Sequence, residues 1–203
     1  MSSISIIGLG NMAGALAGRA LAAGHAVEII GRDPAKAEEL AAELGGATTG
    51  TAPAGDIVVL AVPYGSAAAV VSEYGDALRG KVVIDITNPV NADLTGFVTP
   101  EGGSGAQEIA KAAPADAHVV KAFNTLYANV LSDGRPLDVF IAGDDAQAKA
   151  SVSAFVESLG LRPMDIGQLP MARTLENTAL LMLGLVAHSV KHTNFFLGVT
   201  VLD

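Results

Sequence analysis

The hydrophobic positions of this chain form short runs that alternate with alanine-rich segments. Seven runs, rich in Ile and Val, have the length and the continuous apolar character of buried parallel strands. They are Ser3–Ile7, Ala26–Ile30, Asp56–Val62, Lys81–Ile86, His118–Ala122, Val139–Ala142 and Arg162–Asp165. The segments between them repeat their apolar residues at helical spacing. These predicted helices are Met12–Ala23, Pro34–Leu44, Ser66–Leu78, Ala106–Ala113 and Ala146–Leu159.

Strand and helix patterns that alternate in this way predict an α/β fold, a Rossmann-type, doubly wound and mostly parallel sheet with helices on both faces. From Leu169 the pattern changes to one long helix that runs to His192, followed by an apolar tail that carries Phe195 and Phe196. We therefore expect a Rossmann domain over residues 1–168. Residues 169–203 are expected to form a small helical portion that packs on the site or on a dimer interface.

The composition narrows the classes of partner. The 203 residues are half hydrophobic and 16% charged, as in a globular protein, and their net charge of -9 argues against nucleic acid as the main partner. The absence of cysteine excludes disulfides and thiolate catalysis and suits a cytoplasmic protein. The longest apolar run, Ala179–Ala187, is shorter than the roughly 20 residues that span a bilayer, so no membrane partner is expected.

A glycine motif follows the first predicted strand. In Gly8-x-Gly10-x-x-Ala13, the first glycine permits a tight turn, the second lets a pyrophosphate approach the backbone, and the alanine lets the helix pack closely on the strand. Asn11 and Met12 lie between Gly10 and Ala13, where the helix N-terminus attracts anions. A strand before and a helix after favour a dinucleotide site over a purely structural turn.

The second predicted strand ends without the acidic residue that binds the ribose hydroxyls of NAD. Gly31 stands there, and Arg32 follows. A 2′-phosphate would meet no repulsion at Gly31, Arg32 can bind it bidentately, and Lys36 adds positive charge one helical turn later. Asp33 is expected to cap the helix that begins at Pro34. The pattern predicts NADP as the cofactor, and ordinary surface charges are the alternative interpretation of Arg32 and Lys36.

Prolines and polar residues follow three further strands, in "LAVPYG", "DITNPVN" and "VVKAFNTL". Because the carboxyl ends of parallel strands border the ligand crevice, these residues are candidates for binding, although the same residue types also cap turns. We expect cofactor contacts from Val62, Pro63, Asn88 and Pro89, and contacts to the second substrate from Asn124 and Thr125.

Several catalytic arrangements are absent from the sequence. None of the three tyrosines begins a Tyr-x-x-x-Lys pair, and there is no Gly-x-Ser-x-Gly elbow. His188 and His192 are four residues apart on the long predicted helix, and without an acidic or cysteine neighbour we expect a surface pair. The sequence therefore predicts no catalytic side chain and no metal site.

The chain resembles one family over Ile4 to about Leu185. It shares with the F420-dependent NADP oxidoreductases, in the same order, the segments "IIGLGNMA", "IIGRD", "VPYG", "DITNP", "VVKAFNTL", "VFIAGDD" and "LGLRPMDIGQLPMARTLE". "KAFNTL" is also similar to the cytosolic reductase domain of metalloreductases, and "GLGNMA" to the start of pyrroline-carboxylate, imine and β-hydroxyacid reductases.

The resemblance implies hydride exchange between NADP and an 8-hydroxy-5-deazaflavin coenzyme, F420, by a Rossmann protein that forms a homodimer. By position, it implies that Gly10, Asn11 and Met12 contact the pyrophosphate and that Arg32 and Lys36 hold the 2′-phosphate. Pro63 would lie near the cofactor.

The second substrate stays open among deazaflavin, ordinary flavin and another acceptor, because Asn88-Pro89 and Asn124 depart from the archaeal members. The alternatives to this enzyme are a non-catalytic NADP-binding redox sensor and a reductase of a small imine or carbonyl substrate.

Overall fold

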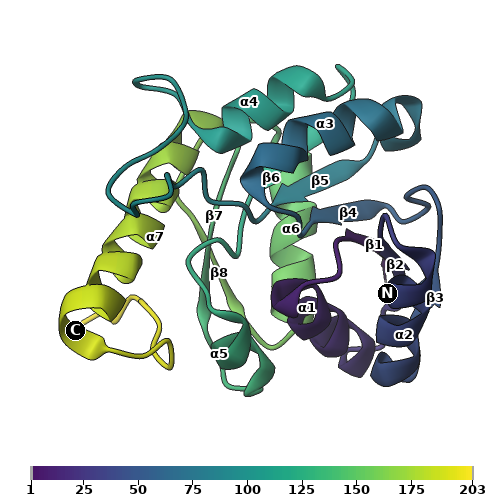
Figure 1. The fold of residues 1–203 in the computed structure, drawn as a ribbon, viewed down its shortest axis with the longest axis horizontal. Helices are drawn as coiled ribbons and strands as arrows, with labels where there is room; N and C mark the ends of the chain where they lie inside the picture. The colour runs from purple at the N-terminus through teal and green to yellow at the C-terminus, as the bar shows by residue number, and fades with distance from the viewer. Residues whose placement is uncertain (1, 203) are drawn as a thin grey trace.

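The computed structural model describes residues 2–202, which form an eight-stranded sheet covered by helices (Figure 1). The strands lie in the order β3-β2-β1-β4-β5-β6-β7-β8. Their bounds are β1 Ser3–Ile7, β2 Ala26–Ile30, β3 Thr48–Thr49, β4 Ile57–Leu60, β5 Val82–Asp85, β6 His118–Lys121, β7 Asp138–Gly143 and β8 Arg162–Asp165. The helices are α1 Asn11–Ala22, α2 Pro34–Leu44, α3 Tyr64–Tyr74, α4 Gly105–Ala112, α5 Ala128–Ser132, α6 Ala146–Ser158 and α7 Ala172–Leu185.

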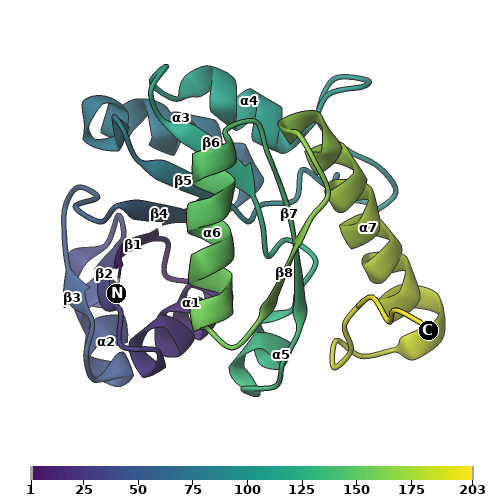
Figure 2. The same ribbon diagram turned by 180° about the vertical axis from the view of Figure 1, so that it is seen from behind.

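Helices cover both faces of the sheet because successive strand residues point to opposite sides. On β4, Ile57 and Val59 join a core beneath α1, α5 and α6. Val58 and Leu60 join a second core beneath α3, α4 and the start of α7. Seen from behind, α6 crosses in front of the sheet (Figure 2). The predicted doubly wound, mostly parallel α/β fold is therefore confirmed.

Most predicted elements are confirmed, and two short ones were missed. The first two strands and the last have the predicted bounds, and Pro34 begins α2 behind its Asp33 cap. The predicted helix Ser66–Leu78 is α3 followed by a 3₁₀ turn over Gly75–Leu78. β3 and α5 were not predicted, because elements of two and five residues are too short to show a hydrophobic period.

β7 differs from the prediction of a parallel strand, because it runs antiparallel to β6. Only the last residues of the two strands pair, Val120 with Gly143 and Lys121 with Ala142. The rest of β7, with β8 beside it, therefore extends past the edge at which β6 ends. An isolated strand pattern carries no information about direction, which depends on how the connection through α5 packs.

The predicted long helix from Leu169 to His192 is interrupted at both ends. A 3₁₀ turn, Leu169–Met171, precedes α7, and a π-helical turn, Val186–Val190, follows it. α7 stands at one side of the molecule in both views, and the tail curls back from its far end (Figures 1 and 2). Within residues 2–202, every helix is too short or too polar to cross a bilayer. The division of the chain at residue 168 and the cytoplasmic location stay predictions.

Candidate active site

The turn between β1 and α1 has the geometry that the glycine motif predicts. Gly8 has a φ of 134° and donates its N–H to the Ile30 carbonyl at 2.8 Å. A Cβ on Gly8 would lie 2.1 Å from the carbonyl oxygen of Ala61, so a side chain has no room there. A Cβ on Gly10 would meet no atom within 4 Å, and α1 begins without a capping side chain. An anion therefore has open access to the first turn of α1.

Arg32 follows β2 and Lys36 lies in the first turn of α2, and both side chains are exposed; we call these two residues the basic corner at β2. Among residues 2–202, no group pairs with the Arg32 guanidinium. Asp33 accepts a hydrogen bond from the Lys36 N–H at 3.3 Å, which confirms its capping role, and its carboxylate lies 4.0 Å from the Lys36 ammonium. Packing also explains why residue 31 is a glycine, because a Cβ there would lie 2.5 Å from the Leu9 side chain.

Val62 and Pro63 follow β4 at the same edge of the sheet. Val62 is half-buried, and Pro63 is exposed and precedes the first residue of α3, Tyr64. Burial, followed by the negative charges of Glu108 and two further carboxylates, raises the pKa of Tyr64. The Tyr64 ring lies beside the start of α4, where a Cβ on Gly105 would be 2.8 Å from it.

The ends of β5 and β6 meet through a pair of amides. The Asn88 Nδ2 donates to the Asn124 carbonyl at 2.9 Å, and the Asn124 Nδ2 donates to the Asn88 Oδ1 at 2.9 Å. Asn124 is buried, whereas Asn88 is only half-buried. Pro89 and Thr125, which follow the two asparagines in the chain, are buried as well. Two of the predicted strand ends thus converge, with Asn88 the more accessible of the two amides.

A buried ion cluster behind these amides was missed by the sequence prediction. Asp85, Lys121 and Glu176 are each 0% exposed. The Lys121 ammonium donates to Asp85 at 2.8 Å, to the Thr87 carbonyl at 2.6 Å and to Glu176 at 3.0 Å. All three N–H donors of the ammonium have partners. A charge can be buried when it is paired and hydrogen-bonded in this way.

Glu176 extends the cluster from α7 to another helix. Its carboxylate accepts the backbone N–H groups of Gly105 at 3.1 Å and Ala106 at 3.4 Å, in the first turn of α4, where a negative charge is favourable. The cluster thus joins β5, β6, α4 and α7. The sequence did contain a sign of this cluster. A charged residue ends each of the apolar runs "VVID" and "HVVK", and a third charged residue, Glu176, lies inside the apolar helix.

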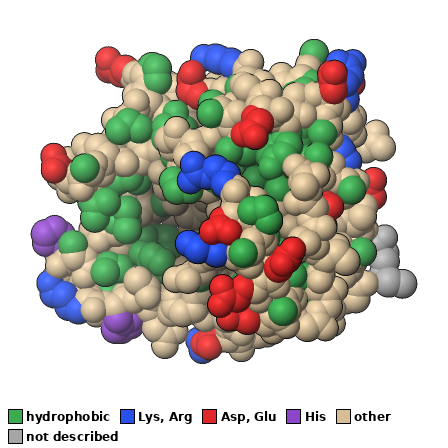
Figure 3. All heavy atoms as spheres, turned by 45° about the vertical axis from the view of Figure 1, so that its right-hand side comes forward, with side chains coloured by type: hydrophobic (Ala, Val, Ile, Leu, Met, Phe, Trp, Pro, Cys, Tyr) green, Lys and Arg blue, Asp and Glu red, His purple; other side chains and the backbone are tan. Residues whose placement is uncertain are grey.

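The surface of the protein is hollowed on one face. Figure 3 shows a hollow near the middle of one face, with Lys or Arg side chains beside it and hydrophobic side chains at its left. The open glycine turn fits a pyrophosphate, and the unpaired guanidinium fits a 2′-phosphate. The residues present therefore fit NADP. The described residues hold no group of three His, Cys, Asp or Glu side chains suited to a metal.

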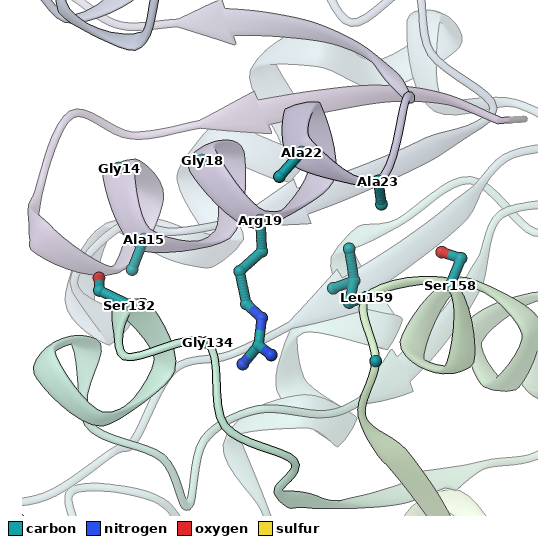
Figure 4. A pocket seen from close by; sticks show the side chains of 11 residues that line it. Gly14, Ala15, Gly18, Arg19, Ala22, Ala23, Ser132, Gly134, Ser158 and Leu159 are labelled. Carbon is teal, nitrogen blue, oxygen red and sulfur yellow. The ribbon is translucent and has the colours of Figure 1, made fainter.

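A separate pocket lies on the far side of α1. It has a volume of about 460 Å³ between α1, the segment after α5 and the end of α6 (Figure 4). The Arg19 side chain enters it and donates to the carbonyls of Leu131 and Arg135 at 3.1–3.2 Å. Arg19 thus serves to hold the loop after α5, and none of the predicted site residues lines this pocket.

Removing the ammonium from the ion cluster should destabilise the whole protein. Lys121→Met leaves two buried carboxylates without their cation, and breaking a buried pair in this way costs about 3–5 kcal/mol. Urea unfolding should show that loss in the free energy of unfolding. Lys111→Met is the matched control, because Lys111 is exposed and pairs with Glu108 at the surface, and it should change little. Equal stability of both variants would contradict the importance of the cluster.

Comparisons with known proteins agree with the geometry. Residues 3–89 match the family model described as NADP oxidoreductase, coenzyme F420-dependent. The F420-dependent NADP reductase of Methanothermobacter marburgensis is 30% identical over 199 residues, covering 88% of this chain and 89% of that protein. Rat metalloreductase STEAP3 is 31% identical over 185 residues, which are 89% of this chain and 37% of the relative, so the chain spans little more than a third of that protein.

A solved structure shares the complete fold. The protein from Arthrobacter sp. FB24, provisionally described as an F420-dependent NADP reductase, superimposes with a TM-score of 0.88. It is 27% identical, and the alignment covers 99% of this chain and 100% of that one. With the glycine turn, the basic corner at β2 and the archaeal relative that matches over its length, the chain belongs to the family of F420-dependent NADP oxidoreductases.

Proposed function

We propose that this NADP-dependent oxidoreductase transfers hydride directly between the nicotinamide and a deazaflavin or flavin-like acceptor. The observation that carries the proposal is the closed ion cluster. Asp85, Lys121 and Glu176 are fully buried and bonded to one another, so none of them offers a proton to a substrate. Carbon-to-carbon hydride transfer needs no such donor. The names of the archaeal relatives support the deazaflavin as acceptor.

In this proposal the chain acts by positioning. The α1 N-terminus and Gly10 bind the pyrophosphate, Arg32 and Lys36 bind the 2′-phosphate, and Val62 with Pro63 flanks the ribose. The bound cofactor supplies the hydride. The protein holds two flat rings in contact and keeps water away from them, and such positioning accounts for much of a barrier reduction.

Tyr64 supports a second candidate, the reduction of a small imine or carbonyl compound. That reaction needs a proton donor beside the developing charge. Tyr64 is the first residue of α3, its ring lies beside Gly105 at the start of α4, and burial raises its pKa above the ordinary value. A non-catalytic NADP-binding sensor is the third hypothesis, and it predicts binding without turnover.

Arg32 should determine the choice between NADP and NAD. A hydrogen-bonded charge pair contributes about 1.5–3 kcal/mol, so NADP(H) should bind roughly tenfold to a hundredfold tighter than NAD(H). Arg32→Ala should remove most of this preference and leave NAD(H) affinity unchanged, as measured by calorimetry. Arg79→Ala is the control, since Arg79 pairs with Asp116 at another part of the surface. Equal affinity of the unmodified protein for the two cofactors would refute the assignment.

Isotope transfer should distinguish the first two reactions. NADPH that carries deuterium at the transferred C4 position should give reduced deazaflavin with deuterium on C5, because that carbon does not exchange with water. Tyr64→Phe should lower kcat by less than about a hundredfold, the low end for lost acid–base catalysis. Solvent hydrogen at C5 would contradict direct transfer. Turnover of an imine with loss of activity in Tyr64→Phe would favour the second candidate.

We also propose a homodimer formed through α7. Its outer face exposes Leu181, which is 57% accessible, and the tail exposes Phe196. Phe195 instead packs against Tyr127 of its own chain, with ring centroids 5.6 Å apart. The tail is also held internally, because Val199 donates its N–H to Asp138 at 2.6 Å. The outer face of α7 is therefore the surface that we expect a second copy to cover.

A charge on this face should prevent association. Leu181→Asp would bury a carboxylate in an apolar interface, so light scattering at micromolar concentration should show a monomer, whereas the unmodified protein should have the mass of a dimer. Gln147→Asp places the same charge on an exposed residue of another helix, α6, and serves as the control. A monomeric mass for the unmodified protein would count against the dimer.

A further inference from the structure

Two unfavourable features meet at the end of β6. Phe123 has a φ of +60° although it is a bulky residue, and it is fully buried. The next residue, Asn124, has a buried Oδ1 atom with no hydrogen-bond partner among the described residues. Backbone strain and an unpaired buried acceptor both lower stability, and they persist where the surrounding structure holds them for a function.

Asn124, held in this position, fixes the orientation of the Asn88 amide through two hydrogen bonds. Asn124 uses both N–H groups of its Nδ2, one toward the Asn88 Oδ1 at 2.9 Å and one toward the Leu175 carbonyl at 3.0 Å. Asn88 returns one N–H to the Asn124 carbonyl at 2.9 Å. This leaves Asn88, which is half-buried, with one N–H that no described group accepts. Flipping the Asn88 amide would place two donors against each other.

The position of Asn88 indicates which part of the cofactor it meets. Arg32 follows β2, on the adenine side of the point where the strand order reverses, between β1 and β4. Asn88 follows β5, on the opposite side, where the nicotinamide half of a dinucleotide lies. The ion cluster next to it contains two carboxylates and one ammonium, which disfavours an anionic ligand group. A neutral acceptor, such as an amide oxygen, fits the free N–H.

We propose that Asn88 donates this N–H to the carboxamide oxygen of the nicotinamide, and that Asn124 is the positioning residue that fixes the Asn88 amide for the purpose. The proposal rests on NADP binding as proposed above. An oriented carboxamide decides which face of the nicotinamide ring meets the acceptor. Because Asn124 also binds the Leu175 carbonyl, this orientation depends on the placement of α7.

The proposal can be tested by measuring the affinities of protein variants for NADP⁺ and for two of its analogues, without measuring turnover. Thionicotinamide NADP⁺ replaces the carboxamide oxygen with sulfur, a weak acceptor, and 2′,5′-ADP lacks the nicotinamide. Calorimetry should show that the unmodified protein prefers NADP⁺ to the thio analogue by about two- to tenfold, the effect of one hydrogen bond. Asn88→Ala and Asn124→Ala should each bring this ratio close to one, and the double variant should change it no further. Affinity for 2′,5′-ADP should stay the same throughout.

Two further variants keep the outcome decisive. Asn88→Asp keeps an acceptor for the Asn124 Nδ2 but lacks both N–H groups of Asn88, and at a half-buried position it provides a second test of the role of Asn88. Asn177→Ala, exposed on α7, should leave the ratio unchanged. An unchanged ratio in Asn88→Ala or Asn88→Asp would overturn the role of Asn88, and an unchanged ratio in a folded Asn124→Ala would overturn the role of Asn124. Failure of the unmodified protein to bind 2′,5′-ADP would instead overturn the proposed cofactor.

Discussion

The ligand-binding edge of the sheet depends on the ion pairs and hydrogen bonds that the buried Lys121 ammonium makes. A fully buried cation needs a partner for each of its N–H groups, and here the partners come from β5, from the backbone that follows it and from α7. Glu176 then connects the same charges to the first turn of α4. Four elements that are distant in sequence are thereby held in one arrangement, and the strand ends that carry Asn88 and Asn124 belong to it.

Charge is divided along this edge in a way that matches the two halves of a dinucleotide. At the end of β2, Arg32 and Lys36 are exposed and available to a phosphate. At the ends of β5 and β6, the charged groups are buried and paired with one another, and a neutral amide is the accessible polar group. The anionic 2′-phosphate of the adenosine half and the uncharged carboxamide of the nicotinamide half would each meet suitable chemistry, which supports both NADP binding and hydride transfer by positioning.

β7, β8 and α7 continue the structure beyond β6, and α7 contacts Asn124 through the Leu175 carbonyl. β7 and β8 extend past the edge at which β6 ends, and α7 is fixed to the cluster through Glu176. The outer face of α7 exposes the apolar side chain of Leu181, while the tail returns to Asp138 and Tyr127 of its own chain. The partner proposed for α7 would therefore meet a surface that this C-terminal portion forms.

Local chemistry explains why the nucleotide turn could be predicted from the sequence. The Gly8 and Gly10 spacing, the Asp33 cap and the strand periods are set by contacts within a few residues or one strand–helix unit, so they are visible as patterns. The direction of β7, the Asn88–Asn124 pair and the Asp85–Lys121–Glu176 cluster are different, because each joins residues 36 to 91 positions apart or depends on how a connection packs. The sequence pattern around a single Lys at the end of an apolar strand does not indicate which residues pair with it. Only the tertiary structure brings the three charges together, because burial makes each of them depend on the others.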